Sequence, residues 1–153
     1  MGDAALEALP GLRALHPEGP LWDTATARLW WVDITGERVH CYDPESSHDR
    51  SWSTAGQPGG VALTTAGEPV VAAPAGLAVL DTDTGKMDLR VAIEQDKPEN
   101  RANDVKIDGR GRAWVGTMAF DKQPGNCGVV PGHRRPGDLH GRRPHHLERA
   151  RVR

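Results

Sequence analysis

Short strand-like segments recur about every 40 residues in the first 130 residues of the chain, and this repeat constrains the fold most strongly. Trp30, Val70 and Trp114 occupy equivalent places in three sets of segments, 40 and 44 residues apart. Ala66-Gly67 and Asp108–Gly111 fall in the equivalent hairpin turns, where Gly and Asp are favoured because such turns need positive φ. A strand repeat of about 40–45 residues is the period of a β-propeller blade.

Most of these strands are predicted from short apolar clusters that are rich in β-branched and aromatic residues and bounded by Gly, Pro and Asp. No window keeps the 3.6-residue period of a helix. The predicted strands cover residues 29–34, 39–42, 60–63, 70–73, 77–80, 105–107, 113–116 and 128–130. We therefore predict an all-β fold, a partial propeller with roughly two and a half to three of the about 4–8 blades that propellers use.

The net charge of −2 conceals two different compositions. Residues 1–130 carry 12 Lys and Arg against 19 Asp and Glu, whereas residues 131–153 carry 7 Arg against 2 acids. The second segment also holds 4 of the 7 histidines. We divide the chain into a propeller part, 1–130, and a basic tail, 131–153, rich in Arg, His, Pro and Gly.

Several classes of protein do not fit the sequence. It has no apolar run near the roughly 18 residues that a membrane span needs. The first six residues have neither the basic region nor the apolar region of a signal peptide. Two cysteines, Cys41 and Cys127, make no disulfide framework. We expect two free thiols, a cytoplasmic location and no membrane partner.

Two polar stretches stand at corresponding places: the first lies just before the first strand of its blade, and the second lies at the equivalent entry to the third blade. Glu18 lies between two prolines, which restrict the backbone on both sides of its carboxylate. Asn100–Val105 contains Arg101 and Asn103, and polar side chains at these places converge on the propeller axis, where a ligand or metal can sit. The alternative interpretations are an acidic loop residue, a solvated arginine and a side-chain turn before a strand.

Together these stretches resemble the family of senescence marker protein 30 (regucalcin), gluconolactonases and luciferin-regenerating enzymes. The resemblance covers roughly residues 8–130. The motifs that carry it are Glu18-Gly19-Pro20 with Trp22, Trp31–Ile34, Gly59–Leu63, and the long run from Asn100–Asp104 into Asp108–Met118. It implies a six-bladed propeller of about twice this length.

The resemblance also implies roles for individual residues. Glu18 takes the place of one ligand of a divalent cation on the axis; calcium fits best, and zinc, manganese and magnesium remain open. Arg101 and Asn103 match the substrate-binding Arg and Asn of the family, and Asp121 falls where some members have a further substrate contact. The remaining ligands are an Asn and an Asp from later blades. That Asp is also the general base, so no catalytic base lies within this chain.

The implied function is metal-dependent hydrolysis of a sugar lactone, of the gluconolactonase type. A dication polarises the ester carbonyl and a carboxylate activates water. Because two ligands and the base are absent, we expect the chain alone to be inactive. The alternatives are a calcium-binding regulatory protein of the same family and a non-enzymatic propeller scaffold. The partner is a small sugar lactone, and the oligomeric state stays undetermined.

The basic tail has three interpretations: an arm that binds nucleic acid, a disordered terminus, or the translation of a shifted reading frame. We favour the third, with no nucleic-acid partner, because out-of-frame translation of a GC-rich gene yields mainly Arg, Pro, Gly, Ala and His. Codons for residues 144–152, read one base later, can encode Leu-Thr-Ile-Ser-Asn-Gly-Leu-Gly. The family carries Ile-Ser-Asn-Gly-Leu at this distance, and its Asn is a metal ligand.

Overall fold

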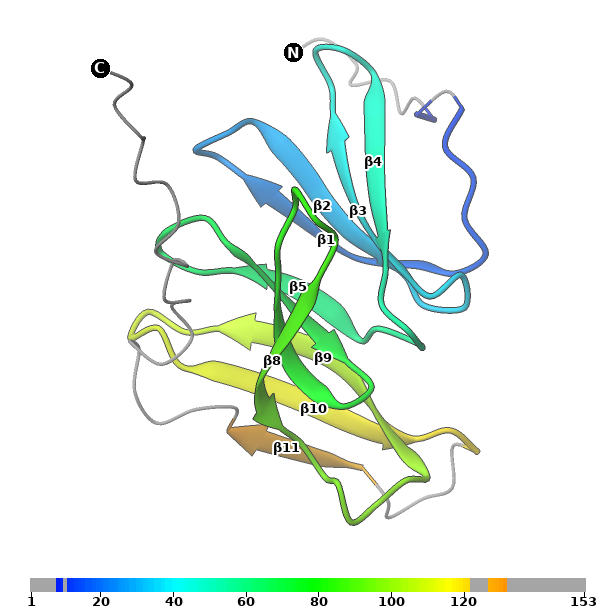
Figure 1. Cartoon of the computed structure of the whole chain (residues 1–153), viewed down its shortest axis with the longest axis vertical. Helices are drawn as coiled ribbons and strands as arrows, with labels where there is room; N and C mark the ends of the chain where they lie inside the picture. Colours follow the sequence, from blue (N-terminus) through cyan, green and yellow to red (C-terminus); the bar gives the residue numbers. More distant parts are fainter. Residues whose placement is uncertain (1–7, 10, 122–126, 132–153) are drawn as a thin grey trace, which may run out of the picture.

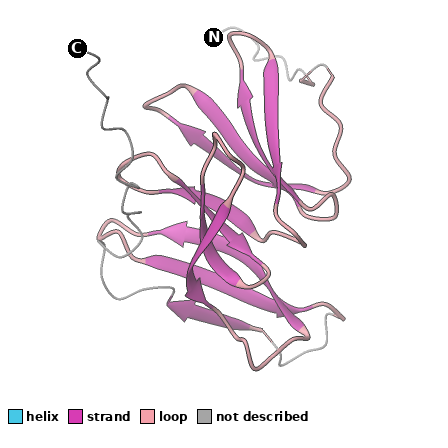
Figure 2. Cartoon of the chain, in the orientation of Figure 1, coloured by secondary structure: helices cyan, strands magenta, loops and turns pink. Residues whose placement is uncertain are grey.

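The computed structural model describes residues 8–9, 11–121 and 127–131, and this part of the chain consists of strands and connecting turns without a helix (Figures 1 and 2). Three antiparallel sheets follow one another along the chain. The all-β prediction is therefore confirmed. Within the described residues, nothing has the length and apolar character of a membrane-spanning helix.

Each sheet is built from consecutive strands. The first sheet has the order β1 (Pro17–Asp23), β2 (Arg28–Asp33), β3 (Arg38–Asp43), β4 (His48–Ser53). The second has the order β5 (Gly60–Leu63), β6 (Pro69–Ala73), β7 (Gly76–Leu80), β8 (Met87–Ala92). The third has the order β11 (Gly128–Pro131), β10 (Ala113–Ala119), β9 (Asn100–Ile107). Two four-stranded sheets and a three-stranded sheet correspond to the repeat seen in the sequence.

The turn between the first two strands of each sheet shows the predicted repeat directly. Gly67 and Gly111 have φ values of 80° and 73°, and Ala27 occupies the same place in the first sheet with φ of 54°. Glycine adopts this left-handed conformation without the steric cost that a side chain brings. The hairpin turns therefore fall where the sequence predicted them.

The sheets pack face to face, and two apolar clusters fill the spaces between them. Trp30 and Val71 belong to the cluster between the first and second sheets, whereas Val70 belongs to the cluster between the second and third. Neighbouring residues of β6 thus point to opposite faces, as strand geometry requires. β6 and β7 in the middle sheet are consequently buried on both sides, and Val70 and Val71 are fully inaccessible to solvent.

The face of the third sheet that points away from the second sheet retains exposed apolar side chains. Trp114 on β10 is 38% exposed and Val129 on β11 is 72% exposed. Trp114 is the counterpart of Trp30 and Val70, which each pack against the next sheet along the chain. This open face supports the prediction that the described strands make up part of a propeller.

Three strands were missing from the sequence-based prediction. They are β1, β4 and β8, whose residues are partly or largely exposed. β4 and β8 lie at sheet edges and carry charged residues, which suits an edge strand but hides the apolar pattern. β1 contains two prolines, which are also tolerated at an edge. The predicted boundary near residue 130 stays a prediction, because residues 132–153 lie outside the described residues.

Candidate functional site

A cavity of about 350 Å³ lies between the first strands of the three sheets. Its polar lining comprises His16, Glu18, Arg101, Asn103, Asp104 and Lys106. Three residues predicted to act together, Glu18, Arg101 and Asn103, therefore line one cavity although up to 85 positions separate them in the chain. Polar residues of the first and third sheets thus line one cavity, and their predicted roles at a site on the propeller axis stay predictions.

Small residues allow the first strands to approach one another at this place. A Cβ atom on Gly59 would lie 2.5 Å from the carbonyl carbon of Ala102, which is closer than real Cβ atoms come. Gly59 N donates a hydrogen bond to Ala72 O at 2.8 Å, so the backbone cannot simply retreat from β9. Gly59 thus brings the second sheet close to the strand that carries Arg101 and Asn103.

The segment that leads into Glu18 is fastened to the end of β2. The buried Asp33 carboxylate accepts hydrogen bonds from Leu15 N at 2.8 Å and from His16 N and Gly36 N, both at 2.9 Å. Ile34 N also donates to His16 O at 3.0 Å. Burial raises the pKa of Asp33, but these N–H donors outweigh it and hold the pKa below its ordinary value.

Glu18 itself differs in one respect from the prediction, because it lies within β1 rather than before it. The register of β1 against β2 shifts between Glu18 and Leu21, and Gly19 has φ of 59°. This irregularity interrupts the regular pairing beside the cavity. The exposed carboxylate of Glu18 accepts one long hydrogen bond within the described residues, from Gly19 N at 3.4 Å.

Arg101 carries a positive charge that no acidic side chain of the described residues pairs with at salt-bridge distance. Its guanidinium donates to Ala102 O at 2.9 Å and to Met118 Sδ at 3.2 Å, and both partners are neutral. Burial lowers the pKa of Arg101 from its ordinary value. The group still remains protonated at neutral pH, as arginine does in proteins.

Asn103 is exposed and lies on β9, which begins at Asn100 and not at Val105 as the sequence pattern suggested. Its neighbour Asp104 accepts hydrogen bonds from Val105 N and Lys106 Nζ, both at 2.8 Å. No role was assigned from the sequence to Asp104, Lys106 or His16, although Asp104 belongs to the motif that contains Asn103. The signal that could have found Asp104 and Lys106 is their nearness to Asn103 on one strand, and the signal for His16 is its position two residues before Glu18.

Asp121 is the one predicted site residue that does not line this cavity. It follows the end of β10 and is exposed. Its predicted contact with substrate therefore stays a prediction.

The residues present fit one part of a cation site. Calcium takes about 6–8 oxygen ligands, and the carboxylate of Glu18 supplies hard oxygen atoms that face the cavity. Across residues 8–9, 11–121 and 127–131, no group of three or more His, Cys, Asp or Glu side chains could hold a metal ion. Other ligands would have to come from elsewhere, as the resemblance implies.

Comparison with known proteins agrees with the fold and the motifs. The family model described as "SMP-30/Gluconolactonase/LRE-like region" matches residues 16–139. A protein named regucalcin from Xenopus laevis is 35% identical over 107 residues, which cover 70% of this chain and 36% of its own length. A Bacillus subtilis protein named "Putative sugar lactone lactonase YvrE" is 34% identical over 120 residues, with 78% and 40% covered.

A solved structure gives the same result in three dimensions. The calcium-binding protein regucalcin of Agrobacterium tumefaciens superimposes with a TM-score of 0.74 and 28% sequence identity, covering 80% of this chain and 42% of that protein. The chain thus spans less than half the length of these relatives. By sequence, motif and fold, it belongs to the SMP-30/gluconolactonase/luciferin-regenerating enzyme family.

Proposed function

We propose that this chain is the first part of a metal-dependent hydrolase that opens a sugar lactone. The observation that carries the proposal is the single cavity lined by Glu18, Arg101 and Asn103. It combines an exposed carboxylate, a partly buried guanidinium and an amide. The description of the family, which includes gluconolactonase, supports the same reaction class.

Each residue has a distinct role in this proposal. Glu18 holds a divalent cation, with calcium the first choice, and the segment just before it is held by hydrogen bonds from Leu15 N and His16 N to Asp33. A bound dication polarises a lactone carbonyl. The N–H groups of Arg101 and the amide of Asn103 hydrogen-bond the hydroxyl and ring oxygens of the sugar, which orients the ester. Asp121 is proposed as a further substrate contact.

The chain alone is proposed to turn over little or no lactone. Its described residues offer Glu18 as a cation ligand but no cluster that could complete the site. The family resemblance puts the other ligands and the general base on later blades. A protein whose reading frame is restored after codons 127–130 is therefore the enzyme to test, and the nucleotide sequence past codon 153 decides whether such a frame exists.

The second candidate is a calcium-binding regulatory protein without significant hydrolysis. Relatives named regucalcin, one of them described as a calcium-binding protein, favour it. A cytoplasmic location is proposed in both cases, since Cys41 and Cys127 are free thiols.

The two candidates separate in one experiment. Acid release from glucono-1,5-lactone is followed with the frame-restored protein, with and without calcium, zinc, manganese or magnesium. Metal-dependent turnover is expected, and Glu18→Gln should lower kcat/KM by about 100-fold or more, because it removes a charged ligand. Glu45→Gln, an exposed turn residue outside the cavity, is the matched control.

Calcium binding without turnover would favour the regulatory candidate. If the protein neither binds calcium nor turns over the lactone, the non-enzymatic propeller scaffold is the interpretation that remains. Turnover that needs no metal would contradict the proposed mechanism.

A further inference from the structure

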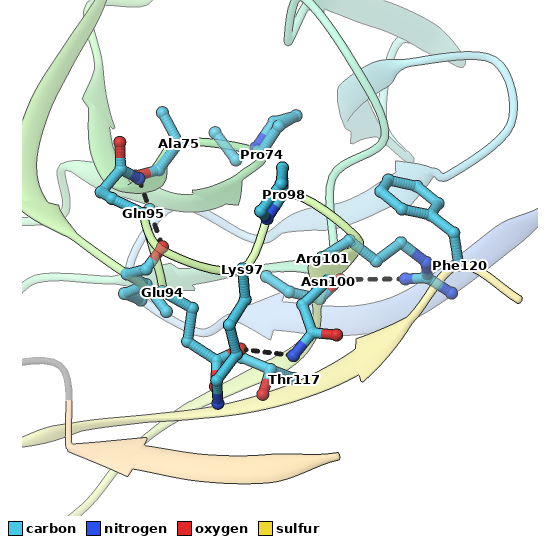
Figure 3. Close-up of a pocket in the computed structure, with 14 residues that line it drawn as sticks. Pro74, Ala75, Glu94, Gln95, Lys97, Pro98, Asn100, Arg101, Thr117 and Phe120 are labelled. Carbon is cyan, nitrogen blue, oxygen red and sulfur yellow. Dashed lines mark hydrogen bonds and ion pairs between the residues drawn. The ribbon is translucent and has the colours of Figure 1, made fainter. Parts of the chain in front are cut away.

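A second cavity of about 350 Å³ lies beside the first, between the turn after β6 and the beginning of β9 (Figure 3). Its polar lining includes Glu94, Lys97, Asn100, Arg101 and Thr117, and Phe120 and two prolines contribute apolar surface. Among the described residues, Arg101 alone lines both cavities. Arg101 therefore stands at the boundary between the proposed lactone site and this second space.

The charges of the second cavity do not cancel. Glu94 accepts hydrogen bonds from Lys97 Nζ at 2.8 Å and Asn100 Nδ2 at 2.9 Å, which Figure 3 shows as a connected network. Hydrogen bonds from Lys97, Asn100 and Thr117 hold the pKa of Glu94 below its ordinary value, so it stays ionised. Glu94 and Lys97 thus compensate each other, and the charge of Arg101 is left over.

Among the described residues, no carboxylate forms a salt bridge with Arg101. Both of its hydrogen-bond acceptors, Ala102 O and Met118 Sδ, are neutral. Glu18 lines the first cavity with Arg101 but lies beyond salt-bridge distance of it, and Asp104 is paired with Lys106. A partly buried cation without an anion is costly, and an anionic ligand would relieve that cost.

The second cavity also offers groups that would recognise the rest of such a ligand. Asn100 lines the cavity, and its Oδ1 is buried and accepts no hydrogen bond within the described part of the chain, so a small movement of the side chain would let a ligand hydroxyl donate to it. The ring of Phe120 is 49% exposed and provides an apolar wall. The charge of Arg101 and the amide of Asn100 come from β9, and the apolar wall comes from Phe120, the residue directly after β10.

We propose that the second cavity is a subsite for an anionic substituent of the lactone, carboxylate or phosphate, which Arg101 binds. The subsite then favours acidic sugar lactones over neutral ones such as glucono-1,5-lactone. This inference rests on the proposed function for the identity of the ligand as a lactone. The binding of the anionic group itself requires neither the cation nor turnover.

Binding of stable ring analogues to the 153-residue chain tests this without any hydrolysis. The probes are neutral 1,5-anhydroglucitol, its 6-phosphate and methyl glucuronide, measured by NMR titration without metal at low salt. Either charged probe is expected to bind about tenfold or more tightly than the neutral one. The tighter of the two identifies the substituent as phosphate or carboxylate.

Three variants make the result specific to Arg101. Arg101→Gln should abolish the preference for the charged probe, and Arg101→Lys should keep part of it, because lysine retains the charge but loses the bidentate geometry. Arg110→Gln removes an exposed turn arginine outside both cavities and should change nothing.

The proposal is overturned if the charged and neutral probes bind equally, if none of them binds, or if the preference survives in Arg101→Gln. It is also overturned if inorganic phosphate binds as tightly as the sugar phosphate, since the cavity would then be a site for free anions. Because no turnover is measured, a failed lactonase assay leaves a positive result here intact.

Discussion

Replacing Asp33 with Asn tests how the segment before Glu18 is held in place. The carboxylate is 5% exposed and accepts three backbone N–H groups, from Leu15, His16 and Gly36, at 2.8–2.9 Å. Asparagine keeps the shape but replaces one oxygen by an N–H₂ group. If the N–H₂ group takes the place of the oxygen that faces Leu15, it and Leu15 N are both donors and oppose each other. The hydrogen bonds from His16 N and Gly36 N then lose their charged acceptor.

The magnitude follows from these three contacts. A hydrogen bond to a charged group contributes about 1.5–3 kcal/mol, and a charged acceptor is roughly twice as strong as a neutral one. Losing one such bond and halving the strength of two predicts a decrease of about 3–6 kcal/mol in the free energy of unfolding. That is a large share of the about 5–15 kcal/mol by which domains are stable.

Urea denaturation of the 153-residue chain, together with amide hydrogen exchange of Leu15 and His16, measures this effect. Asp81→Asn is the matched control, because Asp81 also accepts two backbone N–H groups but is exposed in a turn. The control should lose much less stability. Equal losses in the two variants, or unchanged exchange at Leu15 and His16, would refute the idea that the buried Asp33 carboxylate fastens the segment before Glu18.

Three further predictions concern packing, acid stability and thiol reactivity. Gly59→Ala should lower the unfolding free energy by about 1–3 kcal/mol, since its Cβ would lie 2.5 Å from Ala102, whereas Gly109→Ala, with open space around it, should have little effect in the same denaturation assay. Because the folded-state pKa of Asp33 is depressed, its stabilisation is present above the unfolded-state pKa, about 3.9, and is lost as the pH falls through the folded value. A pH titration of stability should accordingly show a weaker acid dependence in Asp33→Asn than in the unmodified chain; an identical dependence would contradict this. Burial raises the pKa of Cys41 to about 11, so an alkylating agent at pH 8 should modify the exposed Cys127 first, and mass spectrometry of the digested protein reads the order. Faster labelling of Cys41 would show that its thiol is not shielded.

Strand prediction succeeded where the local pattern was strong. The apolar runs of β5, β6 and β7 and the turn glycines Gly67 and Gly111 were recognisable, because a continuous apolar run bounded by turn residues, and a turn that needs positive φ, are properties of a few neighbouring residues. β4 and β8 were missed because edge strands need little apolar surface, and polar sequence then resembles a loop.

The candidate site was predictable in part. Glu18, Arg101 and Asn103 were found from their motifs, and the structure brings them to one cavity. His16 and Lys106 were not found, since neither belongs to a pattern that indicates chemistry. The second cavity could not be predicted from the sequence. Glu94 pairs with Lys97 and Asn100 and so leaves Arg101 without a carboxylate partner among the described residues. This pairing depends on how the connection before β9 folds back.

The sequence by itself determined the strand repeat, the turns, the family and the residues that carry the candidate chemistry, since each of these is written in neighbouring positions. Only the tertiary structure decided that Glu18 and Arg101, 83 positions apart, face one cavity, and that Arg101 forms no salt bridge with a carboxylate of the described residues. The physical reason is that both facts depend on sheet-to-sheet packing. Gly59 sets how closely the strands approach, and no local pattern encodes the distance between side chains on separate sheets.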